Sequence, residues 1–588
     1  MRLRAKKISG IVWVYLIAFA GLAFILVSLM GNAVGSFSIE GDIGTFTLSN
    51  YVDLFEDEDL GPVVLRTLAL GVGSVAVMMM FAFPFAWLIT RTDFPWKGPL
   101  FTLLTAKLAI PGFITAMAYI WLFNPSSGLL NKMFNATGIG VEPIFDVYQL
   151  SWICFLQGIV LTPACVFMML PAFRNMDASL EEAAWVSGVS RLQTIRRVVL
   201  PLLAPGVLAA TLFFFVISIE IFDIVALIGM PGEIEVLVIW IFDAMHPVMG
   251  IPNFGLAGAI GMLLFALCGG AILFYIRMLR QANRYAVIGG KARGFAPQPL
   301  GKWKWPAAAF VGLWVFAAVV LPVITLIWVA LVPYLQPFSM KAVNSMSLIS
   351  FEEALTYIGG PLRNTAIITV GAIMISITLA VSLSWVVTRS RSRAAHWADG
   401  IVFLSPAVPT MVAAVAFQFM GISLYSWVPL YGTIWLIAIA MGVRMLAYCT
   451  RTMNAASIQI HFELDEVART SGVSQLVSFR WIFIPIMMPA IFYSALMVGM
   501  LAARDLTIPL VMNTGKAATI STLIFDLQSN GDQNAAGAIS LYMIVLLALL
   551  AVAAHKLTGM SELGIGSGRS RRRRIRPRRR ETVASPAE

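Results

Sequence analysis

Apolar runs of about 20 residues recur along this chain, separated by short segments that hold most of its charged residues. A helix of that length crosses the roughly 30 Å hydrocarbon core of a bilayer. The pattern predicts an all-α polytopic membrane protein with about twelve transmembrane helices. We expect them near residues 11–32, 64–89, 99–123, 149–172, 201–229, 254–278, 304–333, 364–388, 400–423, 430–450, 486–510 and 537–556.

The apolar pattern repeats itself. Residues 66–91 (RTLALGVGSVAVMMMFAFPFAWLITR) match 363–389 (RNTAIITVGAIMISITLAVSLSWVVTR), and 109–123 match 404–420, each with a proline near its start. Internal duplication is common in transporters, whose substrate path lies between related bundles. We therefore predict two homologous six-helix halves, 1–290 and 291–560, followed by a basic and disordered cytoplasmic tail, 561–588.

Composition excludes a soluble protein. Hydrophobic residues make up 59% of the chain, charged residues 12%, and mean hydropathy is +0.84, whereas soluble domains carry about 25% charged residues. Nine arginines at 569–580 account for most of the net charge of +11. Beside a membrane span, we interpret them as a topology signal rather than a nucleic-acid site. The four cysteines and four histidines are scattered, so no metal or disulfide framework is indicated.

The placement of lysine and arginine predicts the orientation. The loops 33–62, 124–148, 231–253, 334–362, 424–429 and 511–536 hold only Lys132, Lys341 and Lys516, while the opposite loops are rich in both residue types. By the positive-inside rule, the poor loops lie outside and both termini are cytoplasmic.

Two cytoplasmic loops carry one pattern: 177–201 (DASLEEAAWVSGVSRLQTIRRVVLP) and 461–485 (HFELDEVARTSGVSQLVSFRWIFIP). In the first, Ser179 with Glu182 and Ser190 with Gln193 have capping-box spacing, and Gly188 between them can end a helix. In the second, Gly472 and Ser474 take the same places, and the first cap is weaker because Glu463 replaces the serine. The pattern predicts two helix–glycine–helix elbows on the same side of the membrane.

The elbows resemble the EAA loop of ABC importer permeases. The matching residues are Glu182, Ala183, Ala184, Gly188, Leu200 and Pro201 in the first copy, and Glu466, Val467, Ala468, Gly472, Ile484 and Pro485 in the second. The resemblance implies a type I permease whose elbows dock, as coupling helices, on a homodimeric ATP-binding subunit, with a periplasmic solute-binding protein on the outer side. The alternative is an ordinary amphipathic loop whose glutamates pair with Arg196 or Arg480.

The chain has no phosphate-binding loop of the G-x-x-x-x-G-K-[ST] kind, since GGKARG at 289–294 lacks the spacing. We expect it to hold no cofactor, to be no enzyme by itself, and to borrow its ATPase. The resemblance implies a bacterial inner-membrane location.

Charges inside the predicted spans are costly and mark functional positions. Glu220 and Asp223 lie in the fifth span, and Arg504 and Asp505 in the eleventh. A shift of 284 residues places Arg504 opposite Glu220, so we predict that this pair forms a gate or latch between the halves in the translocation path. A purely structural ion pair, or snorkelling, is the alternative. Lys107 is expected to snorkel to the cytoplasmic surface.

Fused permeases with two such loops resemble the ferric-iron, thiamine, polyamine and phosphonate branch of the ABC importers. The segments YIWLFNPSSGLLN (119–131) and IEIFDIVALIGMPG (219–232) are most similar to the ferric-iron members. Ferric iron is the substrate that the resemblance favours, with 2-aminoethylphosphonate, polyamine and thiamine as alternatives. The rival class is a twelve-span ion-coupled secondary transporter, in which Glu220, Asp223 and Asp505 would relay ions, but it has no use for the elbows.

Overall fold

The computed structural model describes residues 2–39, 42–136, 143–175, 184, 186–247, 249–282, 298–389, 393–404 and 408–558. The described chain is almost entirely helical, with one small antiparallel hairpin, β1 with β2, near the N-terminus. The predicted all-α class is confirmed.

The elements of the first half follow one another as α1 (Arg2–Gly35), β1 (Ser38–Ile39), β2 (Asp42–Phe46), α2 (Ser49–Glu56), α3 (Leu60–Arg91), α4 (Lys97–Ala109), α5 (Gly112–Phe123), α6 (Leu129–Ala136), α7 (Leu150–Asn175), α9 (Arg191–Thr194), η1 (Ile195–Val199), α10 (Leu200–Glu220), α11 (Asp223–Gly229), α12 (Leu237–Met245) and α13 (Phe254–Ala282).

The second half repeats this order with η3 (Gly301–Trp303), α14 (Lys304–Val315), η4 (Phe316–Val320), α15 (Leu321–Leu331), α16 (Met340–Asn344), α17 (Ile349–Arg389), α18 (Arg393–Leu404), α19 (Thr410–Ser423), α20 (Ile434–Ile458), α21 (Glu463–Thr470), α22 (Gln475–Ser478), η6 (Phe479–Phe483), α23 (Ile484–Ala503), α24 (Thr507–Met512), α25 (Ile520–Ser529) and α26 (Gln533–Thr558).

Ten helices in the described ranges are long and apolar enough to cross a membrane, or eleven when α4 and α5 are taken as one bent span. The predicted third and ninth spans are not single continuous helices. The third bends by 92° between α4 and α5, and the ninth is divided into α18 and the short helix α19. Pro111 and Pro409 stand directly before α5 and α19 in nearly the same extended conformation. A proline disfavours helical backbone at the residue before it, so both helices break there.

Three other prolines leave their helices continuous. Pro201, Pro322 and Pro485 each follow a π-helical turn: η1, η4 and η6. A proline ring clashes with the carbonyl of the fourth residue before it and provides no N–H. The wider π turn relieves that conflict. The chain can therefore run without a break from each elbow into α10 or α23.

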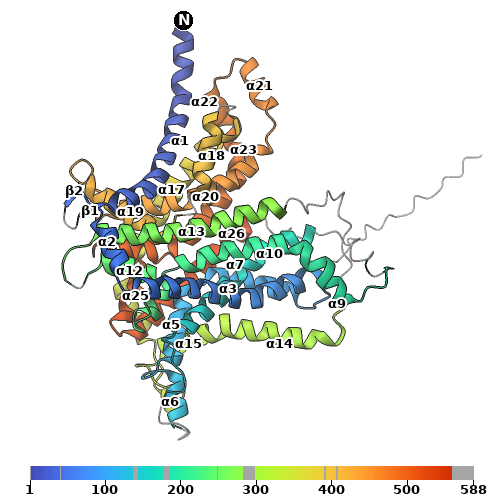
Figure 1. Ribbon diagram of the computed structural model, residues 1–588, viewed down its shortest axis with the longest axis vertical. Helices are drawn as coiled ribbons and strands as arrows, with labels where there is room; N and C mark the ends of the chain where they lie inside the picture. The colour runs from blue at the N-terminus through green and yellow to red at the C-terminus, as the bar shows by residue number, and fades with distance from the viewer. Residues whose placement is uncertain are drawn as a thin grey trace, which may run out of the picture.

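The long helices form two bundles that meet at one end and diverge toward the other (Figure 1). In that view α3, α7, α10 and α14 extend to the right, and α1, α18, α20 and α23 extend upward. The elbow elements α9 and α21 lie toward the two separate ends, which we call the elbow ends. The short elements β1, β2, α2, α12 and α25 gather where the bundles meet, which we call the shared end.

The first helix of each half packs on the other half. Helix α1 contacts α17 and α19 of the second half, and α15 contacts α5 of the first. Near the start of the second half, Phe310 stacks on Phe81 at 5.2 Å, and the buried Trp314 meets the edge of Phe85 at 5.4 Å. The hydroxyl of Tyr119 donates to the carbonyl of Ala317 at 3.1 Å. The halves are thus interlocked rather than merely adjacent.

A polar clip joins the chain before α14 to the loop after α3. Thr92 and Gln298 form a parallel bridge, the amide of Leu300 donates to Asp93 Oδ1 at 2.8 Å, and Lys304 Nζ lies 3.3 Å from Asp93 Oδ2. The amide of Leu300, with the Lys304 charge nearby, lowers the pKa of the Asp93 carboxyl, so the carboxylate stays charged and the clip closed at neutral pH.

Candidate functional site

The two elbows turn at glycines of one conformation. Gly188 and Gly472 both have a φ of 77°, which is the left-handed region that glycine enters at no steric cost. The amide of Val189 donates to Ala184 O at 3.0 Å, and the amide of Val473 donates to Ala468 O at 2.9 Å. This is the Schellman termination of a helix. It gives the matched alanines a local role, because their carbonyls close the turn.

The helix after each glycine begins with a serine cap. Ser190 Oγ accepts from the amide of Gln193, and Gln193 Oε1 accepts from the amide of Ser190, both at 3.4 Å. Ser474 Oγ accepts from the amide of Val477 at 3.4 Å. The predicted capping box at Ser190 and the cap at Ser474 are confirmed. The other predicted cap, Ser179 with Glu182, lies outside the described residues, as does Ala183.

The second elbow exposes an apolar edge of α21. Val467 is 62% exposed and Leu464 and Phe462 are also exposed, while Ala468 faces inward and is buried. Glu466 is exposed as well. Leu200, Pro201, Ile484 and Pro485 stand at the starts of α10 and α23, where they join the elbows to the bundles.

Deep between the bundles, helices start at breaks in the spans, and carboxylates accept hydrogen bonds from backbone amides in their first turns. Asp223 Oδ1 accepts from the amide of Ile224 at 2.8 Å at the start of α11. Asp505 Oδ1 accepts from the amide of Ile508 at 3.0 Å at the start of α24. The first amides of a helix have no partner within it, and water is scarce inside a membrane, so these breaks are tolerated where side chains supply acceptors.

Glu220 crosses to the second half. Its Oε1 lies 3.0 Å from Arg444 Nη2 of α20, and its Oε2 accepts from the amide of Thr410 at 3.2 Å, at the N-terminus of α19. Arg444 also donates to Thr410 Oγ1 at 2.8 Å and to Val408 O at 2.9 Å. The carboxylate thus gains a guanidinium and the positive end of a helix dipole, which offsets the cost of its burial.

Arg504 crosses in the opposite direction. It caps the C-terminus of α23 and donates through Nη1 to the carbonyl of Leu108, near the end of α4 in the first half. The predicted pairing of Glu220 with Arg504 is therefore wrong in this conformation, because Glu220 pairs with Arg444. Each of the two positions nevertheless binds the opposite half.

One cavity of about 260 Å³ lies between the halves and is lined by Glu220, Asp223, Thr410, Arg504, Asp505, Lys107, Ile110, Pro111, Gly112, Met445 and Leu506. Lys107 does not snorkel as predicted. Its side chain is buried, and Nζ donates to Thr115 Oγ1 at 2.6 Å, because the bend between α4 and α5 turns the lysine inward. No group of three or more His, Cys, Asp or Glu side chains that could hold a metal ion occurs among the described residues.

Sequence reasoning missed Arg444 and Thr410, which bind Glu220. Arg444 is a charge within a predicted span, the same signal that singled out Glu220, and applying that test to the tenth span would have found it. Thr410 was not recognisable, because its role comes from a backbone amide exposed by the break at Pro409.

Comparison with known proteins agrees with this architecture. The family described as binding-protein-dependent transport system inner membrane component matches the chain twice, at residues 78–277 and 372–562. The ferric transport system permease protein FbpB of Actinobacillus pleuropneumoniae is 23% identical over 82% of this chain and 68% of its own length. The spermidine/putrescine transport system permease protein PotB of Escherichia coli is 26% identical over 41% of this chain and 85% of its own length.

The two matches cover most of the chain, so the protein belongs to the family of inner membrane components of binding-protein-dependent transport systems. It is a fused ABC importer permease, with the permease domain present twice in one multi-pass inner-membrane chain. The branch suspected from the sequence is confirmed.

Proposed function

We propose that this chain is the two-bundle pore of an ABC importer that brings ferric iron into the cytoplasm, driven by a separate homodimeric ATPase. The observation that carries the ATP-driven mechanism is the pair of elbows. Two segments 284 residues apart end their first helices on the same Schellman turn at glycines of equal φ, and they lie at the separate ends of two diverging bundles (Figure 1). An ATPase dimer that closes would draw the two elbows together.

The layer of Glu220, Arg444, Asp223, Arg504 and Asp505 is proposed as the closure of the translocation path. Its ion pair and its hydrogen bonds join one half to the other. Alternating access requires the contacts between the halves to exchange as the bundles rock. Charged hydrogen bonds suit that purpose, because either member can be satisfied by water or by a passing solute once the contact opens.

Ferric iron is proposed as the substrate because the relatives that match both halves are named as ferric transport permeases. The FbpB proteins match 82% and 72% of the chain, whereas PotB matches a single half. Polyamine is the second candidate, supported by the identity of 26% to PotB. The cavity does not decide between them, because its carboxylates, Glu220, Asp223 and Asp505, are matched by Lys107 and Arg504 in the same lining and by Arg444 paired with Glu220.

The test is transport by the reconstituted complex. The chain is purified with its ATP-binding subunit, placed in liposomes, and supplied with binding protein loaded with ⁵⁵Fe³⁺ or with ¹⁴C-spermidine. Iron uptake that requires ATP supports the proposal. Uptake of spermidine alone would move the substrate to the second candidate. Uptake without ATP that an uncoupler abolishes would replace the ATP-driven importer with an ion-coupled transporter.

A further inference from the structure

Helix α17 connects the second elbow with the shared end of the molecule. It runs unbroken from Ile349 to Arg389, and its only proline, Pro361, lies before Thr365. From Thr365 to Arg389 the helix is about 36 Å long at 1.5 Å per residue. A continuous helix is stiff on this scale, so a displacement of one end is transmitted to the other.

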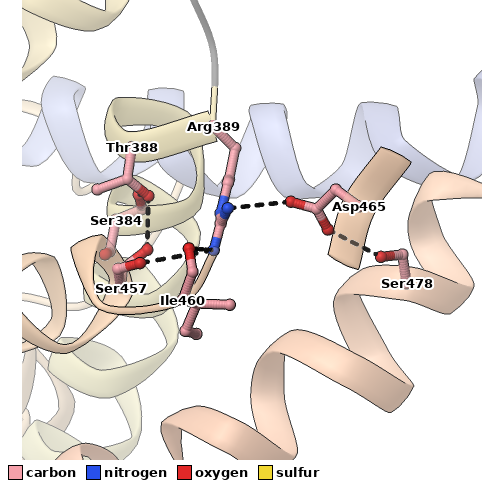
Figure 2. A network of polar contacts seen from close by, with 7 residues as sticks. All are labelled: Ser384, Thr388, Arg389, Ser457, Ile460, Asp465 and Ser478. Atoms are coloured by element: carbon pink, nitrogen blue, oxygen red, sulfur yellow. Dashed lines mark hydrogen bonds and ion pairs between the residues drawn. The ribbon is translucent and has the colours of Figure 1, made fainter. Parts of the chain in front are cut away.

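Arg389 binds the elbow at one end of this helix. Its guanidinium lies 3.2 Å from Asp465 Oδ2 of α21 and donates to Ile460 O at 3.0 Å, as Figure 2 shows. It also stacks over Phe462, with 4.9 Å from its central carbon to the ring centroid. The Arg389 side chain is only 6% exposed. Its hydrogen bond to Ile460 O is charge-assisted and therefore stronger than a neutral one, and the ion pair with Asp465, whose side chain is 30% exposed, adds to it.

Asp465 extends the contact into the second arm of the elbow. Its Oδ1 accepts from Ser478 Oγ at 3.1 Å, and the neighbouring Thr388 shares a hydrogen bond of 2.6 Å with Ser457 at the end of α20 (Figure 2). Arg389 thus holds the coupling helix α21, while the polar contacts around it include the end of α20 and the end of α22. An elbow that shifts must carry the end of α17 with it.

At the other end, α17 holds the segment that leads into α25. Thr365 Oγ1 accepts from the amide of Ile520 at 2.9 Å, and Asn364 Nδ2 donates to Ala518 O at 3.0 Å. Ile520 is the first residue of α25, so Thr365 satisfies one of the amides that have no partner within that helix. Both side chains are buried.

Helix α25 in turn closes on the first half. Gln528 Oε1 accepts from Trp121 Nε1 of α5 at 2.8 Å, and Trp121 is fully buried. This hydrogen bond joins the halves at the shared end. A chain of specific contacts therefore leads from Asp465 through Arg389, Thr365 and Gln528 to Trp121.

The first half contains the same design. Thr67 Oγ1 of α3 accepts from the amide of Leu237, the first residue of α12, at 3.0 Å, and Arg91 at the other end of α3 donates to Phe173 O at 2.6 Å. The position that corresponds to Asp465 is Glu181, which lies outside the described residues. The contact at the shared end therefore occurs in both halves, as does an arginine hydrogen bond to the end of the fourth span, at Phe173 O and at Ser457 O.

We infer that α17 is a transmission rod and that Arg389 is a positioning residue, which couples movement of the second elbow to opening of the contact between α25 and α5. The inference rests on the proposed function, since it assumes that an ATPase moves the elbow. It assigns the coupling to one buried joint, Arg389 with Asp465, rather than to the bundle as a whole.

The test uses the complex with its ATPase in liposomes and measures substrate transported per ATP hydrolysed. R389Q and D465N should retain the bound ATPase and hydrolyse ATP within about twofold of the unmodified complex, with the transport ratio reduced at least about tenfold. T365V, which keeps the side-chain volume at the other end of the rod, should uncouple in the same way. R363Q is the matched control, because Arg363 is exposed on the same helix, and it should stay coupled.

Spin labels at S126C and N530C report the shared end directly, because both positions are exposed there and the four native cysteines are buried. ATP should change the distance between the labels in the unmodified complex but not in R389Q, and R389Q combined with T365V should be no worse than either alone. An ATP response that survives in R389Q overturns the rod and leaves the proposed function intact. Failure of the unmodified chain to bind any ATPase overturns both.

Discussion

Glu220 and Arg444 form an ion pair in the interior of the protein. Both side chains are about nine-tenths buried. Removing one partner of a buried pair leaves an uncompensated charge and costs about 3 to 5 kcal/mol, whereas replacing both by apolar groups is often close to neutral. The pair therefore adds little net stability over an apolar pair of the same shape, although neither partner can be removed alone without a large cost.

We expect R444M to lower the free energy of unfolding by about 3 to 5 kcal/mol, and the double variant E220Q with R444M to lower it by less. Unfolding of the purified chain in detergent, followed by circular dichroism, measures the difference. Strictly additive losses would show that the two side chains act independently. R504Q should show no such coupling to E220Q, because Arg504 binds Leu108 O instead.

The glycines of the elbows provide a second prediction at the residue scale. A Cβ at Gly472 would meet no neighbouring atom, so only its backbone conformation opposes substitution. G472V places a β-branched residue in the left-handed region at a cost of about 1 to 2 kcal/mol and should weaken attachment of the ATPase. Pull-down of the ATP-binding subunit measures this loss.

Gly250 is the matched control for Gly472. It too has a positive φ, and a Cβ added there would meet no atom within 4 Å, but it lies outside the elbows. G250V should suffer comparable local strain while retaining the ATPase. Equal retention by G472V and G250V would contradict a role for the elbow turn in docking.

The sequence predicted the contacts of those residues whose partners are near neighbours in the chain. The glycine stops and the serine caps depend on near neighbours in the chain, and they occur as expected. The partner of Glu220 depends on how two bundles cross, which no local pattern contains. The internal repeat correctly gave Arg504 the equivalent position, but equivalence under a repeat does not imply contact.

At the scale of the element, the apolar runs located the spans within a few residues at most boundaries. Each boundary that the apolar pattern misplaced has a physical cause. Helix α17 begins at Ile349, well before the expected start near 364, because helix-forming residues continue the helix beyond its apolar stretch. Prolines mark the breaks at Pro111 and Pro409. A proline alone does not predict a break, however, because the chain stays helical through Pro201 and Pro485.

Close packing between helices predicts which small residues are essential. A Cβ on Gly158 of α7 would stand 2.6 Å from the Val77 side chain of α3 and 3.0 Å from the amide nitrogen of Met78. G158A should therefore cost about 1 to 3 kcal/mol through overpacking. Thermal unfolding of the purified chain checks it. G269A on α13, where a Cβ meets nothing within 4 Å, should be neutral or slightly stabilising.

Helix α12 should respond to pH through His246. Burial lowers the pKa of His246 below its usual value near 6.5, although a contact of its Nδ1 with Phe242 O partly opposes this. The unfolded segment consequently takes up the proton first as the pH falls. Stability of the segment should therefore decrease from about pH 7.5 to about 5.5, and faster hydrogen exchange of residues 237–247, corrected for the intrinsic rate, should report it.

H246Q should remove this pH dependence. Asp243 has a pKa raised by burial, with the charge of Glu235 adding to the effect, and it is present in both proteins, so the difference between them isolates the histidine. Helix α25, the equivalent element in the second half, has no histidine and serves as an internal reference. Identical pH profiles for the two proteins would refute the assignment.

At the scale of the whole molecule, the sequence did not predict that the first helix of each half packs on the other half. An apolar helix in lipid gains little from one apolar neighbour over another, so hydropathy does not indicate which bundle it joins. The choice is made by shape and by a few polar contacts. Gly21 of α1 packs against Leu379 and Leu383 of α17, and the Asp93 clip holds the start of α14 to the first half.

The interlocking predicts how the chain can be divided. A fragment 1–290 lacks α14 and α15. Phe81 then loses its contact with Phe310, Phe85 loses its contact with Trp314, and Tyr119 loses its acceptor on Ala317. A fragment 1–336 keeps these partners. We expect 1–336 to unfold at a higher temperature than 1–290 in the same detergent, although both lack the surface on which α1 packs.

Co-expression separates the packing between the halves from their covalent connection. Fragment 1–290 should co-purify with 291–588, because α1 and α15 each contact the opposite fragment and no covalent link is needed for those contacts. Fragment 1–290 with 337–588 should associate less tightly, since α14 and α15 are then missing and only α1 crosses between the fragments as a first helix. If the two pairs assembled equally well, the exchanged helices α14 and α15 would contribute little, and the polar layer around Glu220 would have to hold the halves together.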